Sequence, residues 1–322
     1  MLLLRKLKKI DRFLIFTIKP EIMLKIEQTE TRILTPGQKQ HLADKGYLVV
    51  PNVLSQDEVN TALEMFKGWQ ATIPNHHTIH RKCDPHGIYK HHQAGHQEHA
   101  WYIRTRPKVK QVFSEIWDTN ELVVSFDGSC WIPKDTTAKD NFWCHSDQAP
   151  KDKGLTCYQG VIGLTDNKQR TLVVWEGTHT IHYEYFKRLG REKQSGAWQR
   201  IPNEDEENLK PLRRVLHIPP GAIAIWDSRT FHQNQYGPLN CEERYAQYIC
   251  MLPKNHAKNT ANIQAKRLKY FKEKRTTSHW PYPLKVNGLQ PRSWGDDSLR
   301  INYDELREPN LEPYMETIKT LI

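Results

Sequence analysis

Two apolar runs of strand length stand in LTCYQGVIGLTDNKQRTLVVWEG, residues 155–177, on either side of a polar turn. They are rich in Val, Ile, Leu and aromatic residues, so each predicts a buried β-strand. Four more runs of this kind are ELVVSFD (121–127), NFWCHSD (141–147), GAIAIWD (221–227) and RYAQYICML (244–252). Many short strands divided by turn signals indicate an antiparallel sandwich or barrel.

Helical patterns precede these strands. Residues 34–70 predict a helix, a short strand (GYLVV), a turn and a second helix, with Thr35 and Ser55 as the two N-caps. Pro36 takes the first helical position, where its missing N–H does no harm. A further helix is expected at RPKVKQVFSEIW, residues 106–117. Helices followed by many strands define an α+β fold.

Three segments are less regular. Residues 72–100 are rich in His, Gly and Pro without clear periodicity and are expected to form a loop or lid. Residues 181–213 predict a charged helical insertion between strands. Residues 255–322 predict a helical and then irregular stretch.

The expected organisation is one large domain at 34–255, with extensions on both sides. Residues 1–33 are expected to be a flexible N-terminal extension, and residues 256–322 a C-terminal extension packed on the core. The apolar runs of the first 27 residues are too short to span a bilayer. Two interpretations stay open: a weak amphipathic targeting helix, or an upstream extension with Met23 as the natural start.

Composition limits the classes of function. The 47 Lys+Arg against 37 Asp+Glu leave a formal charge of +10, which attracts anions in general. The basic residues are scattered, which favours a solvated surface and leaves nucleic acid as a minority alternative. The cysteines are far apart and contain no CxxC pair, which favours reduced thiols in a cytoplasmic compartment. There are six of them: Cys83, Cys130, Cys144, Cys157, Cys241 and Cys250.

A metal site is predicted where NFWCHSD ends. Residues two apart on a strand point to one face, so His145 and Asp147 can face the same ion. His232, just past the run GAIAIWD, supplies a third ligand. Two imidazoles and one carboxylate leave coordination positions open, as an Fe(II) oxygenase requires. Arg244 opens the strand at 244–252 and can point inward to bind a carboxylate; the alternative is a surface pair with a neighbouring acid, Glu242 or Glu243.

These motifs carry a family resemblance. HSDQAP, YQGVIGLTDN, TLVVWEGTH, GAIAIWDSRTFH and the following Arg244 resemble the phytanoyl-CoA dioxygenase (PhyH-like) family of Fe(II)/2-oxoglutarate oxygenases, over residues 34–255. The resemblance implies a double-stranded β-helix (jelly-roll, cupin-like) core with iron on His145, Asp147 and His232. It implies that Arg244 binds the distal carboxylate of 2-oxoglutarate and that Asn234 touches this co-substrate.

The reaction implied by the resemblance uses Fe(II), 2-oxoglutarate and O2 and releases succinate and CO2. Hydroxylation of a small organic molecule is the default outcome, with desaturation or ring closure as alternatives. The family's acyl-CoA substrate is not carried over, because its members act on many small molecules. Two other functions stay open: an oxygenase acting on a protein or nucleic-acid group, and a catalytically silent jelly-roll binding protein.

Four further residues are candidates for the cavity. Gln159 is a polar residue in the middle of a strand and is expected at the co-substrate pocket. Asp127 either lines the cavity or caps a turn, and Arg229 either faces the pocket or pairs with Asp227. His99 is a candidate for the substrate mouth.

The other histidines leave two expectations. For the His-rich segment 76–99 two interpretations stay open: solvated histidine side chains, or a second structural metal site. His279 and Trp280 can close over the cavity.

Overall fold

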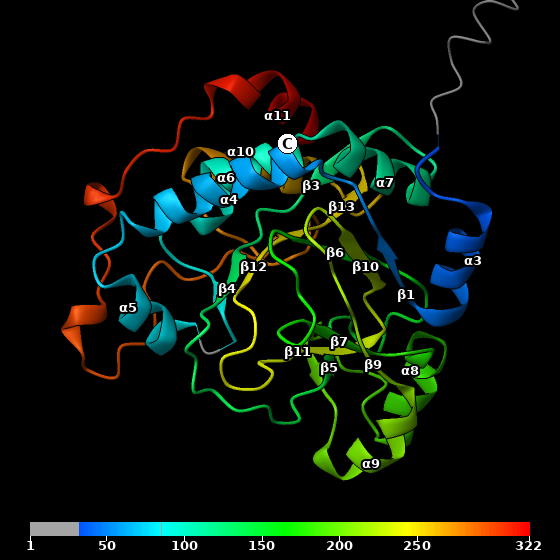
Figure 1. Ribbon diagram of the computed structural model, residues 1–322. Coiled ribbons are helices and arrows are strands. Elements are labelled where there is room, and N and C mark those ends of the chain that lie inside the picture. Colours follow the sequence, from blue (N-terminus) through cyan, green and yellow to red (C-terminus); the bar gives the residue numbers. More distant parts are fainter. Residues whose placement is uncertain (1–31, 85) are drawn as a thin grey trace, which may run out of the picture.

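Two antiparallel β-sheets pack face to face in the computed structural model, which describes residues 32–84 and 86–322 (Figure 1). The larger sheet has the strand order β1-β10-β6-β12-β4-β2, and the smaller has the order β8-β5-β11-β7-β9. The strands of the larger sheet are β1 (Tyr47–Val50), β2 (Ile88–Tyr89), β4 (Ser129–Ile132), β6 (Tyr158–Gly163), β10 (Ile223–Asp227) and β12 (Arg244–Ile249). Those of the smaller sheet are β5 (His145–Ser146), β7 (Leu172–Trp175), β8 (Gln199–Arg200), β9 (Arg213–Val215) and β11 (Phe231–Asn234).

A third, two-stranded sheet is formed by β3 (Leu122–Val124) and β13 (Met251–Pro253). The six predicted strand runs all contain strands, and the arrangement is the expected α+β fold with a jelly-roll core of two facing antiparallel sheets. The predicted N-terminal extension lies outside the described residues except for Arg32 and Ile33.

Alternation along the strands decides which side chains face the interior between the sheets. On β10, Ile223 and Ile225 pack under the helices, whereas Ala224 and Trp226 pack between the two sheets. A strand places successive side chains on opposite faces, so both faces of the larger sheet are buried. The continuous apolar run of β10 is the sequence signature of a strand that is covered on both sides.

Helices cover the outer face of the larger sheet (Figure 1). They are α4 (Gln56–Gln70), α6 (Glu98–Arg104), α7 (Pro107–Trp117), α10 (Ala261–Lys272) and α11 (Met315–Leu321). Elsewhere lie α3 (Pro36–Lys45), α5 (His76–Cys83), α8 (Thr178–Arg188) and α9 (Glu206–Leu209). The predicted caps are confirmed: Thr35 and Ser55 each form a capping box, with Gln38 and Glu58 respectively.

The loop predicted at 72–100 is partly wrong. It contains α5, the short strand β2 and the start of α6. The helix α5, with the sequence HHTIHRKC, has no apolar repeat, and its buried residue is His80. Nε2 of His80 donates to the main-chain oxygen of Trp131 at 2.8 Å, and its Nδ1 lies 3.1 Å from Oδ2 of Asp84. Tertiary contacts of a polar residue stabilise this helix, so an apolar periodicity could not reveal it.

A hairpin-like segment after α10 packs against the core. Thr277 and Val286 form an isolated antiparallel bridge, and the main chain of Thr277 donates to the Phe126 oxygen at 2.8 Å. The Phe126 N–H donates to the Thr277 hydroxyl at 3.0 Å. The stretch 277–287, which we call the C-terminal hairpin, is thereby fixed beside the chain that leads into β4.

Within the described residues, no helix is long and apolar enough to cross a bilayer. All six cysteines are free, and four of them are buried.

Candidate metal centre and its cavity

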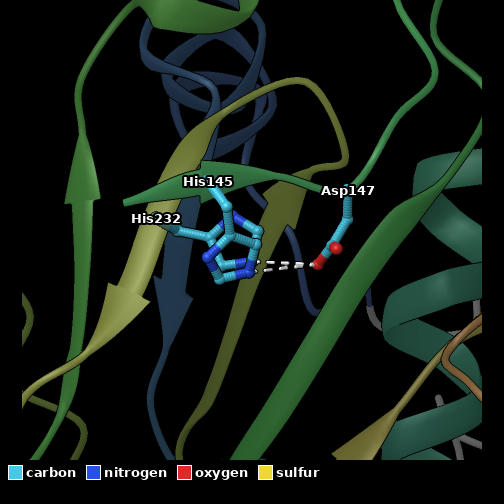
Figure 2. Close-up of side chains that lie close together, drawn as sticks. All are labelled: His145, Asp147 and His232. Carbon is cyan, nitrogen blue, oxygen red and sulfur yellow. Dashed lines mark hydrogen bonds and ion pairs between the residues drawn. The ribbon is translucent and has the colours of Figure 1, made fainter. Parts of the chain in front are cut away.

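The three predicted metal ligands converge on one point (Figure 2). His145 on β5 and His232 on β11 are directly opposite in the register of these two strands. The Nε2 atom of His232 lies 3.1 Å from Oδ2 of Asp147, and the Nε2 atom of His145 lies 3.7 Å from the same oxygen. One ligand atom from each residue lies within 4.8 Å of the other two. Strand pairing thus joins His145 and Asp147 to a histidine that is distant in sequence.

Backbone carbonyls orient both imidazoles. Nδ1 of His145 donates to the Trp143 oxygen at 3.3 Å, and Nδ1 of His232 donates to the Thr230 oxygen at 2.9 Å. A carbonyl can only accept, so the proton is on Nδ1 and the lone pair of each Nε2 faces the carboxylate. Three acceptor atoms therefore meet with no proton between them, an arrangement that a cation would stabilise.

All three side chains are buried, between 5 % and 7 % exposed. Burial alone would raise the pKa of the Asp147 carboxyl, but the facing His279, His145 and His232 hold it well below its usual range. Burial lowers the pKa of His145, and the neighbouring His232 lowers it further. The low pKa of Asp147 favours an ionised carboxylate and the lowered pKa of His145 favours a neutral imidazole, and both are protonation states that bind a metal ion.

The centre opens into a cavity of about 530 Å³. That volume lies in the range of small-molecule sites. Three tryptophans contribute apolar walls: Trp143, Trp198 and Trp226. Polar and charged residues also line it: His86, Lys90, Asp127, Gln159, Asn234, Tyr248, Thr277, Ser278, His279 and Asn287.

A fully buried arginine lies beside this cavity. Nη1 of Arg244 donates to Oδ1 of Asn234 at 3.0 Å, while its Nε and Nη2 have no hydrogen-bond partner. The alternative of a surface pair is wrong, because Glu242 accepts from the main chain of residues 168–170 and Glu243 accepts from Trp131. A guanidinium buried without an anion is costly, so its orphaned donors suit a carboxylate ligand.

Gln159 lies at the cavity, where the sequence placed it, and Asp127 lies there too, which is the first of its two alternatives. Nε2 of Gln159 donates to Oδ2 of Asp147 at 3.3 Å. Asp127 is 4 % exposed, and its Oδ1 has no hydrogen-bond partner.

Arg229 and His99 do not line the cavity, contrary to their candidacy for the substrate pocket. Arg229 instead forms the ion pair with Asp227 that was its alternative, with Nη2 2.6 Å from Oδ2. His99 is fully buried under the helices, where its ring stacks on Phe66 and its Nε2 lies 2.8 Å from the Ser129 hydroxyl. His99 was expected in a loop but lies on the short helix α6, and its sequence gave no signal that it packs in the helical layer.

Several residues that line the cavity were not predicted from the sequence. Tyr248, which is hydrogen-bonded to Asn234, lies on the same face of β12 as Arg244 and Ala246, so strand alternation could have revealed it. Thr277 and Asn287 of the C-terminal hairpin carry no local signal. His279, expected as a closing residue, lines the cavity.

A second metal site in the His-rich segment is not supported. Over residues 32–84 and 86–322, His145, Asp147 and His232 are the one group of His, Cys, Asp and Glu side chains close enough to hold an ion. His80 pairs with Asp84, and His76 and His77 pack on Trp131.

The sequence model of the family described as phytanoyl-CoA dioxygenase (PhyH) matches residues 42–235, more than half of the chain. The chain belongs to the phytanoyl-CoA dioxygenase family. This family is one of Fe(II)- and 2-oxoglutarate-dependent oxygenases. The family match includes His145, Asp147, His232 and Asn234 and ends before Arg244.

One curated relative of this family member is Ava biosynthesis cluster protein O from Aspergillus versicolor. The two are 30 % identical over 181 residues, which cover 52 % of this chain and 58 % of the relative. The chain therefore spans less than two thirds of the length of the curated relative that it matches.

Among solved structures, GlcNAc Inducible Gene 2 from Candida albicans is similar with a TM-score of 0.63 at 13 % identity, covering 91 % of this chain and 77 % of that one. EctD from S. alaskensis, solved with 2-oxoglutarate and 5-hydroxyectoine, has a TM-score of 0.48 at 15 % identity, covering 70 % of this chain and 78 % of that one. The first of these likenesses supports the fold over nearly the whole chain, including the part beyond the family match.

Proposed function

We propose that this protein is an Fe(II)- and 2-oxoglutarate-dependent dioxygenase that hydroxylates a small organic molecule, with succinate and CO2 as co-products. One observation carries the proposal: the acceptor cluster of His145, Asp147 and His232 lines the same cavity as Asn234, and Asn234 holds an unneutralised buried arginine, Arg244. A cation and a carboxylate are the two partners that these groups lack.

His145, Asp147 and His232 are the proposed iron ligands. Their donor set of two imidazoles and one carboxylate is the set that non-haem Fe(II) oxygenases use. When bound, the iron and 2-oxoglutarate supply O2 activation and an oxidant that removes hydrogen from the substrate. The protein holds the ligands through the strand pair β5 and β11 and through the carbonyls of Trp143 and Thr230.

Arg244 is the proposed partner of the distal carboxylate of 2-oxoglutarate. Asn234 would orient its guanidinium through Oδ1, and the hydroxyl of Tyr248 lies 2.9 Å from the Asn234 amide nitrogen. Gln159, close to Asp147, is proposed to lie against the co-substrate near the metal. Apolar side chains such as Leu172 and Trp226 would exclude water from the reacting atoms.

A small substrate is supported by the size of the cavity, since the metal ligands are buried and the space is about 530 Å³. The segment 256–322 is proposed to belong to the same functional domain, because its hairpin lines this cavity. A cytoplasmic location is proposed on the ground of six free cysteines, which a reducing compartment maintains.

The test is an anaerobic titration of Fe(II) and 2-oxoglutarate into the purified protein, followed by the weak visible charge-transfer band of the complex. The band is expected in the wild type, and it should be lost in His145→Ala and Arg244→Ala. His217→Ala and Arg188→Ala, at exposed side chains outside the cavity, are the matched controls and should keep it. A wild-type protein that binds no 2-oxoglutarate and gives no band overturns the proposal.

A further inference from the structure

A carboxylate without a cationic partner among the described residues stands in the wall of the metal cavity. Asp127 lines the cavity and is 4 % exposed. Its Oδ1 is buried without a hydrogen-bond partner, and no lysine, arginine or histidine of the described residues forms an ion pair with it. A buried carboxylate is normally paired, because leaving it without a partner is costly.

The cation nearest to Asp127 is occupied elsewhere. The Arg104 guanidinium is fully buried and donates to the main-chain oxygens of Gly95 and Asp127, at 2.6 and 2.8 Å. It therefore fixes the backbone of Asp127 and forms no ion pair with its carboxylate. Burial raises the pKa of Asp127 to about 6, although the charge of Arg104 and a hydrogen bond from the Ser125 side chain both lower it, as expected of a desolvated acid without a cationic partner.

The backbone is fixed on both sides of Asp127, at Phe126 and at Gly128. Phe126 forms two hydrogen bonds with Thr277 of the C-terminal hairpin. A Cβ atom at Gly128 would lie 1.7 Å from the Tyr89 oxygen, so only glycine allows the close approach of β2 to β4. The carboxylate is therefore held at a set place relative to the metal ligands.

The other unpaired charge of the cavity is different in kind. Lys90 follows β2 at the rim and is exposed, so water can solvate its ammonium group. Asp127 has no such access and needs a partner from the ligand. Of the cavity tryptophans, Trp143 is stacked against His86 and His145, whereas Trp198 lies beside His145 with half of its surface exposed. Trp198 therefore offers an aromatic face that attracts cations and flat apolar groups.

We propose that the substrate of this enzyme carries a basic nitrogen, and that the protonated nitrogen docks on the Asp127 carboxylate while the rest of the molecule lies toward the tryptophans. The inference rests on the proposed function, because it names the substrate class of the same site. Asp127 is thus a specificity-determining residue that selects amines over neutral or acidic molecules of the same shape.

The experiment uses protein loaded anaerobically with Fe(II) and 2-oxoglutarate. Three probes of similar shape are titrated: 2-phenylethylamine, its neutral counterpart 2-phenylethanol, and the acid 3-phenylpropionate. Binding is followed by tryptophan fluorescence and by the change in the charge-transfer band. We expect the amine to bind the wild type at least about tenfold more tightly than the alcohol, with the acid weakest, because a charge-assisted hydrogen bond in a buried site is worth that factor.

Asp127→Asn keeps the shape and removes the charge, so the amine preference should disappear in this variant. Asp57→Asn, at an exposed position on α4, should keep the preference. The charge-transfer band without added probe reports that Asp127→Asn still folds and binds both cofactors.

The two proposals fail in different ways. A missing band in the wild type removes the proposed function itself. A normal band with no amine preference in the wild type, whether all three probes bind alike or none binds, overturns the inference alone. A preference that survives in Asp127→Asn overturns it as well.

Discussion

Asn234 Oδ1 lies 3.0 Å from Nη1 of Arg244, so a neutral amide on the smaller sheet holds a fully buried guanidinium on the larger sheet. The same Oδ1 lies 3.3 Å from the Tyr248 hydroxyl. No carboxylate of the described residues forms an ion pair with Arg244. Asn234 therefore positions the positive charge of Arg244 without neutralising it, which is what a site for an external carboxylate requires.

Asn234→Asp is therefore expected to weaken 2-oxoglutarate binding by about 100-fold. The new carboxylate would neutralise Arg244 from a fixed position and repel the carboxylate of the co-substrate. Titration of 2-oxoglutarate into the Fe(II)-loaded protein under anaerobic conditions measures the effect. Gln235→Asp is the matched control, because Gln235 bonds Arg213 at the exposed side. An unchanged affinity in Asn234→Asp would contradict the role of Arg244.

Gln159→Leu tests the contact with the metal centre. The Gln159 amide donates to Oδ2 of Asp147 at 3.3 Å, and partners of this kind orient metal ligands. Its loss is expected to reduce Fe(II) affinity about tenfold, as measured by anaerobic calorimetry. Gln56→Leu on the exposed face of α4 serves as the control. If Fe(II) affinity is unchanged and 2-oxoglutarate affinity falls, Gln159 contacts the co-substrate alone.

The sequence was sufficient for the parts of the site that depend on strand alternation. His145 and Asp147 share a face because they are two residues apart, and Arg244 points inward because Tyr245 and Ile249 on the other face pack under the helices. The strand around His232 was not predicted, since FHQN is polar and too short to show a period. Its pairing with β5 became visible only in the fold.

Long-range packing explains what the sequence could not predict. His99 and Arg229 are of the right residue types for a pocket, but their places depend on which helix or acid lies beside them in space. The C-terminal hairpin lies 132 residues beyond His145 where it begins at Thr277, and an irregular segment carries no periodic pattern that points to a partner.

Thr277→Val tests whether the C-terminal hairpin is part of the folded domain. The Thr277 hydroxyl accepts from the buried Phe126 N–H at 3.0 Å, and valine has the same shape without an acceptor. The free energy of unfolding is expected to fall by about 1–3 kcal/mol, the cost of a buried donor without a partner. Urea unfolding measures it, with Thr180→Val at an exposed position as the control. Equal unfolding midpoints in both variants would count against a packed hairpin.

The buried histidines predict that acid destabilises the protein. Burial, with a smaller contribution from the neighbouring Arg104 guanidinium, lowers the pKa of His99 to about 3. The unfolded chain, with an ordinary histidine pKa of about 6.5, then binds more protons than the folded chain between these two values. The stability contribution of neutral His99 is therefore complete above pH ~6.5 and is lost as the pH falls toward ~3.

His99→Phe removes the titrating group and keeps an aromatic ring against Phe66. Between pH 7.5 and pH 5 the wild type is expected to lose about 2 kcal/mol more of its free energy of unfolding than this variant. Urea unfolding of both proteins at the two pH values checks the difference, and comparison within each protein cancels the lost bond to Ser129. His77→Gln, at an exposed position on α5, is the control. If His99→Phe loses as much stability as the wild type over this interval, His99 is not held neutral in the folded state.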